Sequence, residues 1–225
     1  MQRFFDILLS LMAILVLSPV LVPVLLILRF TGEREIFYLQ ARMGKNNNKF
    51  NLLKFATMLK NSDQMKNGTV TVRDDPRVLP FGKFLRKSKI NELPQLFNIL
   101  LGHMSVIGPR PQTPNYFDNI DSETQKILLH HRPGLSGIGS IVFRNEEDIL
   151  FGQDDHLDYH DRVLTPYKTK LELWYFKKRS LLYYFAFIFI TAYVVVSKES
   201  NLHWKIFKDI PQPPDQLKNH LGHIK

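Results

Sequence analysis

The stretch RKSKINELPQLFNILLGHMSVIGPRP, residues 86–111, decides how the rest of the chain is interpreted. Asn91 is a favourable residue for capping a helix N-terminus, and Gly102 stands where a left-handed C-terminal cap is typical. We therefore expect a short helix that is buried on one face and begins at Asn91 and Glu92. Its apolar residues recur with the spacing of one helix face, at Leu93, Leu96, Phe97, Leu100 and Leu101.

The predicted start of this helix is a candidate phosphate site, because a helix N-terminus offers unpaired N–H groups and a positive dipole end. A carboxylate set among cations, here Glu92, can hold Mg²⁺ or attack a phosphorus centre. The alternative is structural: Asn91 only caps the helix, Glu92 only complements its dipole, and the cations form a solvated face. Those cations stand on both sides of the site, at Arg86, Lys87, Lys89 and Arg110.

Length and composition narrow the class of protein. The 225 residues suit one compact domain with membrane attachments. The formal net charge of +9 predicts an anionic partner, and both nucleic acid and an anionic membrane surface fit that charge. Apolar segments near both ends favour the membrane, and no zinc-finger, RNA-binding or helix-turn-helix signature is visible. The absence of cysteine from the sequence excludes disulfides and thiolate catalysis.

The N-terminal segment from Ile7 to Leu28 is apolar except for two serines and two prolines. A straight helix of this length would be about 33 Å long, enough to cross a bilayer core. Pro19 and Pro23 predict a bend, and arginines at both ends disfavour crossing. We expect a re-entrant helix that enters and leaves on one face. The alternative is an ordinary transmembrane helix kinked at proline.

Short patterns predict the elements of the body. Residues 36–39 and 50–53 read as two strands around the turn at residues 44–48. A helix is expected from Ser122 to His131, and a strand at residues 140–143. Farther on, His156 and His160 share a helix face with Asp155 nearby, which allows a metal site. A charged helix face is the favoured interpretation of those three residues.

The C-terminal part is apolar and aromatic before it becomes polar. Residues 181–196 are apolar almost throughout, but their helix would be only about 24 Å long, short of a ~30 Å core. We therefore expect it to lie in the membrane interface or pack against the first segment. Trp204, Ile206 and Phe207 predict a further interfacial piece. Residues 211–225 are expected to be loose.

In several ordered blocks, the chain resembles the bacterial sugar transferases, the monotopic polyprenyl-phosphate phosphoglycosyl transferases. The resemblance extends to about Arg144. Two departures stand out: the family usually has Asp-Glu at Asn91-Glu92, and usually a basic residue at Ala56. The blocks are Ser18-Pro19, Arg42-Met43-Gly44, Lys54-Phe55 with Thr57-Met58, Asp75-Pro76-Arg77, Phe81 to Arg86, Glu92 to Leu96, Met104-Ser105, Gly108 to Pro111 and Arg132-Pro133-Gly134.

The resemblance implies transfer of a sugar-1-phosphate from a nucleotide diphosphate sugar to polyprenyl (undecaprenyl) phosphate, with release of a nucleoside monophosphate. It places Ser18 and Pro19 at the bend of a re-entrant helix. It also implies that the residue at Asn91 would carry the phospho-sugar, which an amide cannot do. Glu92 is then the candidate nucleophile, base or metal ligand, with Asn91 beside it. The alternative is a catalytically disabled relative that binds substrates or a partner subunit.

The sequence thus predicts a mixed α/β fold, mostly α with a small β-hairpin, anchored to the inner face of a bacterial cytoplasmic membrane. We expect a membrane helix at residues 1–30, a catalytic domain at 31–170, interfacial helices at 171–208 and a tail at 209–225. Mg²⁺ is the expected cofactor, and a homodimer is compatible with the chain. Two anionic substrates need fixed cations, for which the candidates are Lys54, Arg86, Arg110, Arg132 and Arg144.

Overall fold

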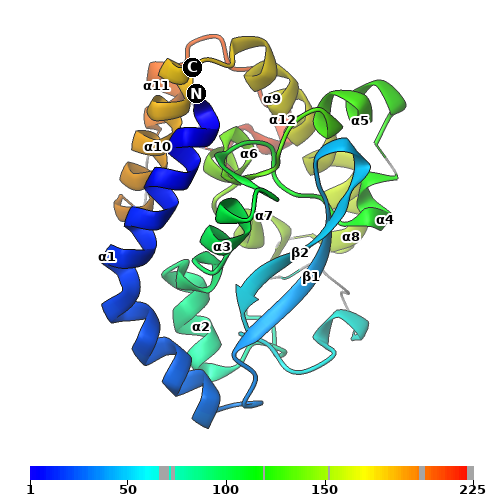
Figure 1. Ribbon diagram of the computed structural model, residues 1–225. Coiled ribbons are helices and arrows are strands. Elements are labelled where there is room, and N and C mark those ends of the chain that lie inside the picture. Colours follow the sequence, from blue (N-terminus) through cyan, green and yellow to red (C-terminus); the bar gives the residue numbers. More distant parts are fainter. Residues whose placement is uncertain (66–70, 72–73, 119, 152, 198–200, 222–225) are drawn as a thin grey trace.

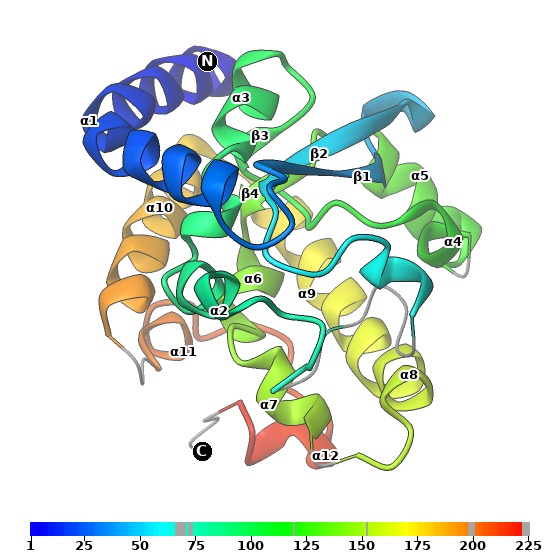
Figure 2. The same ribbon diagram turned by 90° about the horizontal axis from the view of Figure 1, so that it is seen from below.

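A computed structural model describes residues 1–65, 71, 74–118, 120–151, 153–197 and 201–221 of the 225. Within these ranges the chain is mostly helical and carries two small sheets of two strands each (Figure 1). The expectation of a mainly helical protein with a small hairpin is confirmed. The long N-terminal helix lies along one side of the body, and Figures 1 and 2 both show helix α10 (Leu181–Val196) beside it.

The N-terminal helix, α1 (Gln2–Phe30), runs through Pro19 and Pro23 without interruption, and Figure 1 shows it curved around the body. The hydroxyl of Ser18 donates to the carbonyl of Leu15 at 2.8 Å. By its length and composition the helix can cross a membrane. The re-entrant path with Ser18 and Pro19 at its deepest point stays a prediction.

Both ends of α1 are fastened to the same body. Near its start, the carboxylate of Asp6 is 2 % exposed and accepts hydrogen bonds from the hydroxyls of Ser105 at 2.8 Å and Tyr184 at 2.9 Å. Near its end, Leu28 belongs to the same buried apolar cluster as Leu85. The opposite side of α1 exposes large apolar side chains along its length, so it is left uncovered by the body.

The predicted hairpin is confirmed. Strands β1 (Phe37–Met43) and β2 (Lys49–Phe55) pair antiparallel, with Phe37 opposite Phe55 and Met43 opposite Lys49. The connecting turn contains a short 3₁₀ segment, η1 (Lys45–Asn47), in the Asn-rich stretch where a turn was expected. A second short 3₁₀ segment, η2 (Ser62–Gln64), follows β2.

The helix predicted to begin at Asn91 begins later. Helix α2 (Pro80–Lys87) is followed by a 3₁₀ turn, η3 (Ile90–Glu92), and then by α3 (Gln95–Leu100) with Pro94 at its N-cap. The capping role predicted for Asn91 is therefore wrong. Lys89 takes a left-handed conformation with φ of 60°, which ends α2 and starts a separate turn ahead of α3. Gly102, with φ of 88°, does provide the predicted left-handed residue after the helix.

The structure also contains a pair of parallel strands that the sequence did not predict. Strand β3 (Ser105–Ile107) pairs with β4 (Gly134–Ser136), and helices α4 (Pro114–Phe117) and α5 (Ser122–Leu129) lie between them in sequence. The predicted helix at α5 is confirmed. The predicted strand at residues 140–143 is wrong, because α6 (Ile138–Val142) covers it. Its branched side chains are buried in the core, and that packing overrides their preference for strands.

The C-terminal half is helical and closes the core. It contains several short helices, a π-helical turn and two long helices, of which α10 contacts α1. In its described part, residues 211–221, the tail predicted to be loose is instead packed: Leu217 is fully buried and Leu221 is 7 % exposed, because both insert into the main core. Residues 222–225 of that prediction lie outside the described residues. The elements are α7 (Glu146–Phe151), α8 (His156–Tyr159), η4 (His160–Leu164), α9 (Thr165–Lys178), α10, α11 (Leu202–Ile206) and α12 (Asp215–Lys218).

Candidate active site

Four cations act on the carboxylate of Glu92. Lys54 extends from β2, Arg86 from the last turn of α2, and Arg110 from the turn that follows β3, while Lys89 directly precedes η3. Of the residues predicted to bind phosphate, the structure therefore brings three together around the predicted catalytic carboxylate. We call Glu92 and these four cations the Glu92 cluster. The elements that carry them are far apart in sequence and meet where η3 contacts β2 and α2.

The position of Lys54 is fixed by a side chain of α3. Asn98 accepts a hydrogen bond from the backbone N–H of Leu53 at 2.9 Å and donates one to the carbonyl of Asn51 at 2.8 Å. Asn98 is 4 % exposed, so water does not compete strongly for these bonds. The amide therefore holds the end of β2 in a set register against η3, and with it the ammonium of Lys54 beside Glu92.

Glu92 is ionised and lacks a direct partner. Burial alone would raise the pKa of its carboxyl, but Arg110, followed by the three lysine and arginine side chains around it, lowers that pKa below the ordinary value. Among the described residues, none forms a hydrogen bond or an ion pair with this carboxylate. The carboxylate is thus available to a ligand while its charge is stabilised at a distance.

The positive charges of this site lower one another's pKa values. Burial, and after it Arg42, lowers the pKa of Lys54 to about 7. Burial, and after it Arg110, lowers the pKa of Arg42 to about 9. Burial is the larger cause of both shifts, and repulsion between neighbouring cations adds to it. A ligand that brings several negative charges would relieve the repulsion, so the site is suited to a phosphate or diphosphate group.

Arg42 is a site residue that the sequence reasoning missed. Its Nη1 donates to the carbonyl of Pro111 at 2.9 Å and its Nη2 to Gln40 at 2.6 Å, while its buried Nε has no hydrogen-bond partner in the described part of the chain. The alternation along β1 was the available signal, because Tyr38, Gln40 and Arg42 share the less exposed face of the strand. Arg42 thus supports the turn that carries Arg110 and adds a cation to it.

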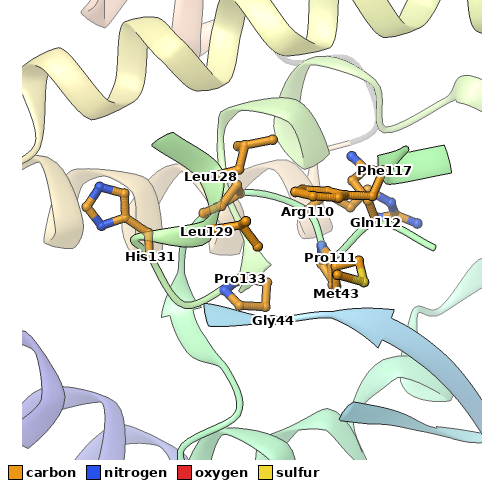
Figure 3. Close-up of a pocket in the computed structure, with 11 residues that line it drawn as sticks. Met43, Gly44, Arg110, Pro111, Gln112, Phe117, Leu128, Leu129, His131 and Pro133 are labelled. Carbon is orange, nitrogen blue, oxygen red and sulfur yellow. The ribbon is translucent and has the colours of Figure 1, made fainter. Parts of the chain in front are cut away.

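Arg110 stands between two prolines, which stiffen its backbone. Figure 3 shows its side chain at a small pocket with Phe117 and Leu128 on the neighbouring helices. The cavity is only about 20 Å³, room for a single water molecule. This pocket is too small to hold a nucleotide.

A second ionic network, centred on Glu146, interacts electrostatically with Arg110. Glu146 of α7 pairs with Lys168 of α9 at 2.6 Å and with the Nε2 of His160 at 3.3 Å. Burial opposes the charge on Glu146, but Lys168, His160 and Arg110 outweigh it and lower its pKa far below the ordinary value. Arg86 forms a separate ion pair with Glu147 of α7, with 2.6 Å between its Nη2 and the Oε1 of Glu147. Glu147 therefore positions Arg86, and Glu146 acts on Arg110 only through its charge; sequence reasoning assigned neither role.

Two predicted phosphate-binding arginines lie outside the Glu92 cluster. Arg132 donates its Nε to the carbonyl of Gly102 at 2.7 Å, at the opposite end of α3. Arg144 donates to the carbonyls of Val195 at 3.1 Å and Ser197 at 3.4 Å, at the end of α10. Neither contributes to the shifted pKa of Glu92. Their phosphate-binding roles stay predictions.

The residues present fit a magnesium ion that substrate phosphates help to hold. Mg²⁺ often binds through one or two carboxylates plus substrate phosphates, and Glu92 offers one such carboxylate. Beside it in sequence, the amide oxygen of Asn91 is buried and has no hydrogen-bond partner among the residues that the structure describes. Within the described part of the chain, no three histidine or acidic side chains form a group that could hold a metal by themselves. Asp155, weighed as a ligand, caps α8 instead.

Comparison with known proteins identifies the group to which these features belong. Residues 1–198 match the family described as bacterial sugar transferase. The exopolysaccharide production protein ExoY of Sinorhizobium fredii is 37 % identical over 159 residues, which cover 64 % of this chain and 70 % of that protein.

Two further relatives are named for reactions. The UDP-N-acetylgalactosamine-undecaprenyl-phosphate N-acetylgalactosaminephosphotransferase of Aeromonas hydrophila is 39 % identical over 144 residues, 63 % of this chain and 34 % of that protein. The UDP-glucose:undecaprenyl-phosphate glucose-1-phosphate transferase of Klebsiella pneumoniae is 32 % identical over 163 residues, 70 % of this chain and 34 % of that protein. The chain thus spans about a third of the length of these two relatives.

Proposed function

Because the chain belongs to the bacterial sugar transferase family, we propose that it moves a sugar-1-phosphate from a nucleoside diphosphate sugar to undecaprenyl phosphate and releases a nucleoside monophosphate. As a phosphoglycosyl transferase it must bind two anionic substrates, and its relatives are named for undecaprenyl-phosphate reactions. The product would start a surface glycan or glycoconjugate. The observation that carries this proposal is the cluster of cations around the ionised Glu92.

The cluster suits the charge changes of this reaction. Overall, a phosphate oxygen of the acceptor becomes bonded to the β-phosphorus of the donor, and the bond from that phosphorus to the bridging oxygen breaks. The bridging oxygen keeps the electron pair and leaves with the nucleoside monophosphate. Negative charge grows on the leaving oxygen, and Lys54, Arg86 and Arg110 can stabilise it from fixed positions.

We assign the reactive carboxylate to Glu92. As a nucleophile, one of its oxygens would bond to the β-phosphorus as the nucleoside monophosphate leaves, and the acceptor oxygen would then displace the carboxylate. Asn91 cannot do this, because it is an amide and only 7 % exposed. The alternative role of Glu92 is to hold Mg²⁺ with Asn91 nearby. When bound, the ion would neutralise diphosphate charge.

An acceptor with a lipid tail needs a site at membrane level. Helix α1 exposes apolar side chains such as Val16 at 73 %, and α10 beside it exposes Leu182 at 77 %. Both ends of α1 contact one body, which supports a re-entrant anchor with both ends on the same side. We place the protein on the cytoplasmic face of the bacterial inner membrane, where nucleotide sugars are made available.

The second candidate function is that of a disabled relative that binds substrates or a partner without turnover. Asn91 favours it, because the family resemblance expects a carboxylate at that position. Within the described ranges the buried amide oxygen of Asn91 has no hydrogen-bond partner, so the fold tolerates the residue without using this oxygen. Since a carboxylate is nearly isosteric with the amide, Asn91→Asp is a suitable variant to separate the two candidates.

The deciding experiment measures release of nucleoside monophosphate from a nucleotide sugar when undecaprenyl phosphate is added to the purified protein in detergent. The parent, Asn91→Asp and Glu92→Gln are compared, with Mg²⁺ present and with chelator. Release by the parent that Glu92→Gln abolishes supports the transferase with Glu92 as its carboxylate. An inactive parent restored by Asn91→Asp identifies a disabled enzyme. Full activity of Glu92→Gln would remove Glu92 from the mechanism.

A further inference from the structure

A second group of cations lines a cavity of about 100 Å³ at the beginning of α1. The cavity lies between that helix, the turn that leads into β4, and the residue that follows α9. It is about five times the volume of the pocket beside Arg110, and several heavy atoms can enter it. Its basic side chains are Arg3, Lys45, His130, Arg132 and Arg179.

This cavity and the Glu92 cluster lie at opposite ends of α3. Glu92 precedes the helix, whereas Arg3 donates to the carbonyls of its last residues, Ile99 at 2.6 Å and Leu100 at 2.9 Å. Arg132 donates to Gly102 just beyond them. The two groups of cations are therefore separate sites.

The arginines of the cavity are held in place and still have unused N–H groups. Arg132 uses only its Nε, and its two terminal nitrogens have no partner among the described residues. Arg179 donates its Nε and its Nη2 to the side-chain oxygen of Gln2, at 3.2 and 2.5 Å, and its Nη1 to the Nδ1 of His131 at 2.5 Å, which leaves one N–H on each terminal nitrogen. Burial, and then Arg179, lowers the pKa of His131 to about 4, so this histidine is neutral and can accept the bond.

The positive charge of the cavity is not compensated by the protein. Within the described ranges, Arg3, Lys45, Arg132 and Arg179 form no ion pair with a carboxylate. Asp6 also lines the cavity, but it accepts three hydrogen bonds from the protein, including the backbone N–H of Val106 at 2.9 Å. Four cations thus face one carboxylate that is already satisfied, and such an excess favours an anion.

We propose that this cavity is a second binding site for a phosphate group, separate from the one around Glu92. Guanidinium groups in a fixed fork match phosphate oxygens. The start of α1 and of α10 bring exposed apolar side chains beside it, with Phe4 at 66 % and Leu182 at 77 %. A phosphate at this level can come from a membrane lipid headgroup or from solution. The same guanidinium chemistry would bind either.

The test uses the full chain in detergent and needs no turnover. Two probes are titrated separately, inorganic phosphate and a short-chain phosphatidic acid, and binding is followed by the shift of the unfolding temperature and by calorimetry. The test variant is Lys45→Gln with Arg179→Gln. A charge-matched control, Lys49→Gln with Lys177→Gln, removes two exposed lysines that do not line the cavity. All proteins also carry Arg110→Gln, which weakens phosphate binding at the Glu92 cluster.

We expect the apparent dissociation constant of at least one probe to rise about tenfold or more in the test variant and little in the control. If the test variant loses affinity for both probes, a phosphate group suffices for binding. If it loses affinity for phosphatidic acid alone, the ligand is a lipid. Because Arg179 also contacts α1, Arg179→Lys is measured too, and it should retain more affinity than Arg179→Gln. Equal affinities in test and control variants, for both probes, would overturn the proposal.

Discussion

The Oε1 atom of Glu172 lies 2.8 Å from the place that a β-carbon on Gly139 would occupy. Glycine is thus what allows α6 to approach α9 so closely. The backbone N–H groups of Gly139 and Arg110 favour the charged form of this carboxyl group and so act to lower its pKa. Burial nevertheless dominates and raises the pKa of Glu172 to about 8, so the group is protonated at neutral pH.

This buried acid makes stability depend on pH. In the folded state Glu172 keeps its proton up to about pH 8, whereas in the unfolded state it loses it near the ordinary value of 4.5. The folded state then binds more protons between these values, so its stability falls as pH rises through that window. Glu172→Gln stays neutral at every pH and should flatten this decline. The change of the unfolding temperature between pH 5, 7 and 8.5 measures this effect. Glu123→Gln, which changes an exposed glutamate, is the control. Parallel curves for the parent and Glu172→Gln would contradict the raised pKa.

Lys54 should take up a proton when a diphosphate binds. Its pKa of about 7 leaves it partly neutral at pH 7.5, and a ligand with several negative charges raises that pKa. Binding should therefore weaken as pH rises above 7, and heat of binding should differ between buffers of different ionisation enthalpy. Lys54→Arg is always charged and should abolish the buffer dependence. Proton uptake that persists in Lys54→Arg would assign it to another group.

Arg110→Lys should reduce kcat/KM for the nucleotide sugar about tenfold or more. The lysine keeps the charge but loses the planar fork that holds two phosphate oxygens at once. Steady-state release of nucleoside monophosphate measures the effect, and Arg162→Lys, on the exposed side of η4, is the matched control. If the two variants are equally active, Arg110 has only a structural role.

Both ends of α1 should react with an impermeant thiol reagent from the same side of the membrane. The chain has no cysteine, so single cysteines can be introduced without background. One is placed in a short extension before Met1 and the other at Glu33, which is exposed just after the helix. Labelling is compared between inverted membrane vesicles and intact spheroplasts. Labelling from opposite sides would establish a transmembrane helix instead.

The sequence was sufficient where local patterns determine structure and insufficient where distant segments meet. Two short apolar runs around an Asn-rich turn were enough to predict the hairpin, and a continuous apolar run of helical length was enough to predict α10. The parallel pair joins Ser105 to Gly134, and its three-residue strands are too short to show a pattern. Lys54 and Arg110 could be named because they bear charge beside a recognisable motif. Glu146 and Glu147 could not, because only the packing of α7 brings them to the arginines.

The contact between Asp6 and Tyr184 has a consequence for how the protein is made. The two residues are 178 positions apart, so the ribosome produces the phenol roughly 10 to 40 seconds after the carboxylate at ordinary rates of synthesis. During that interval the first helix carries an acid that is costly to place in lipid and lacks one of its donors. We therefore expect α1 to complete its contacts with the protein only after α10 has been synthesised.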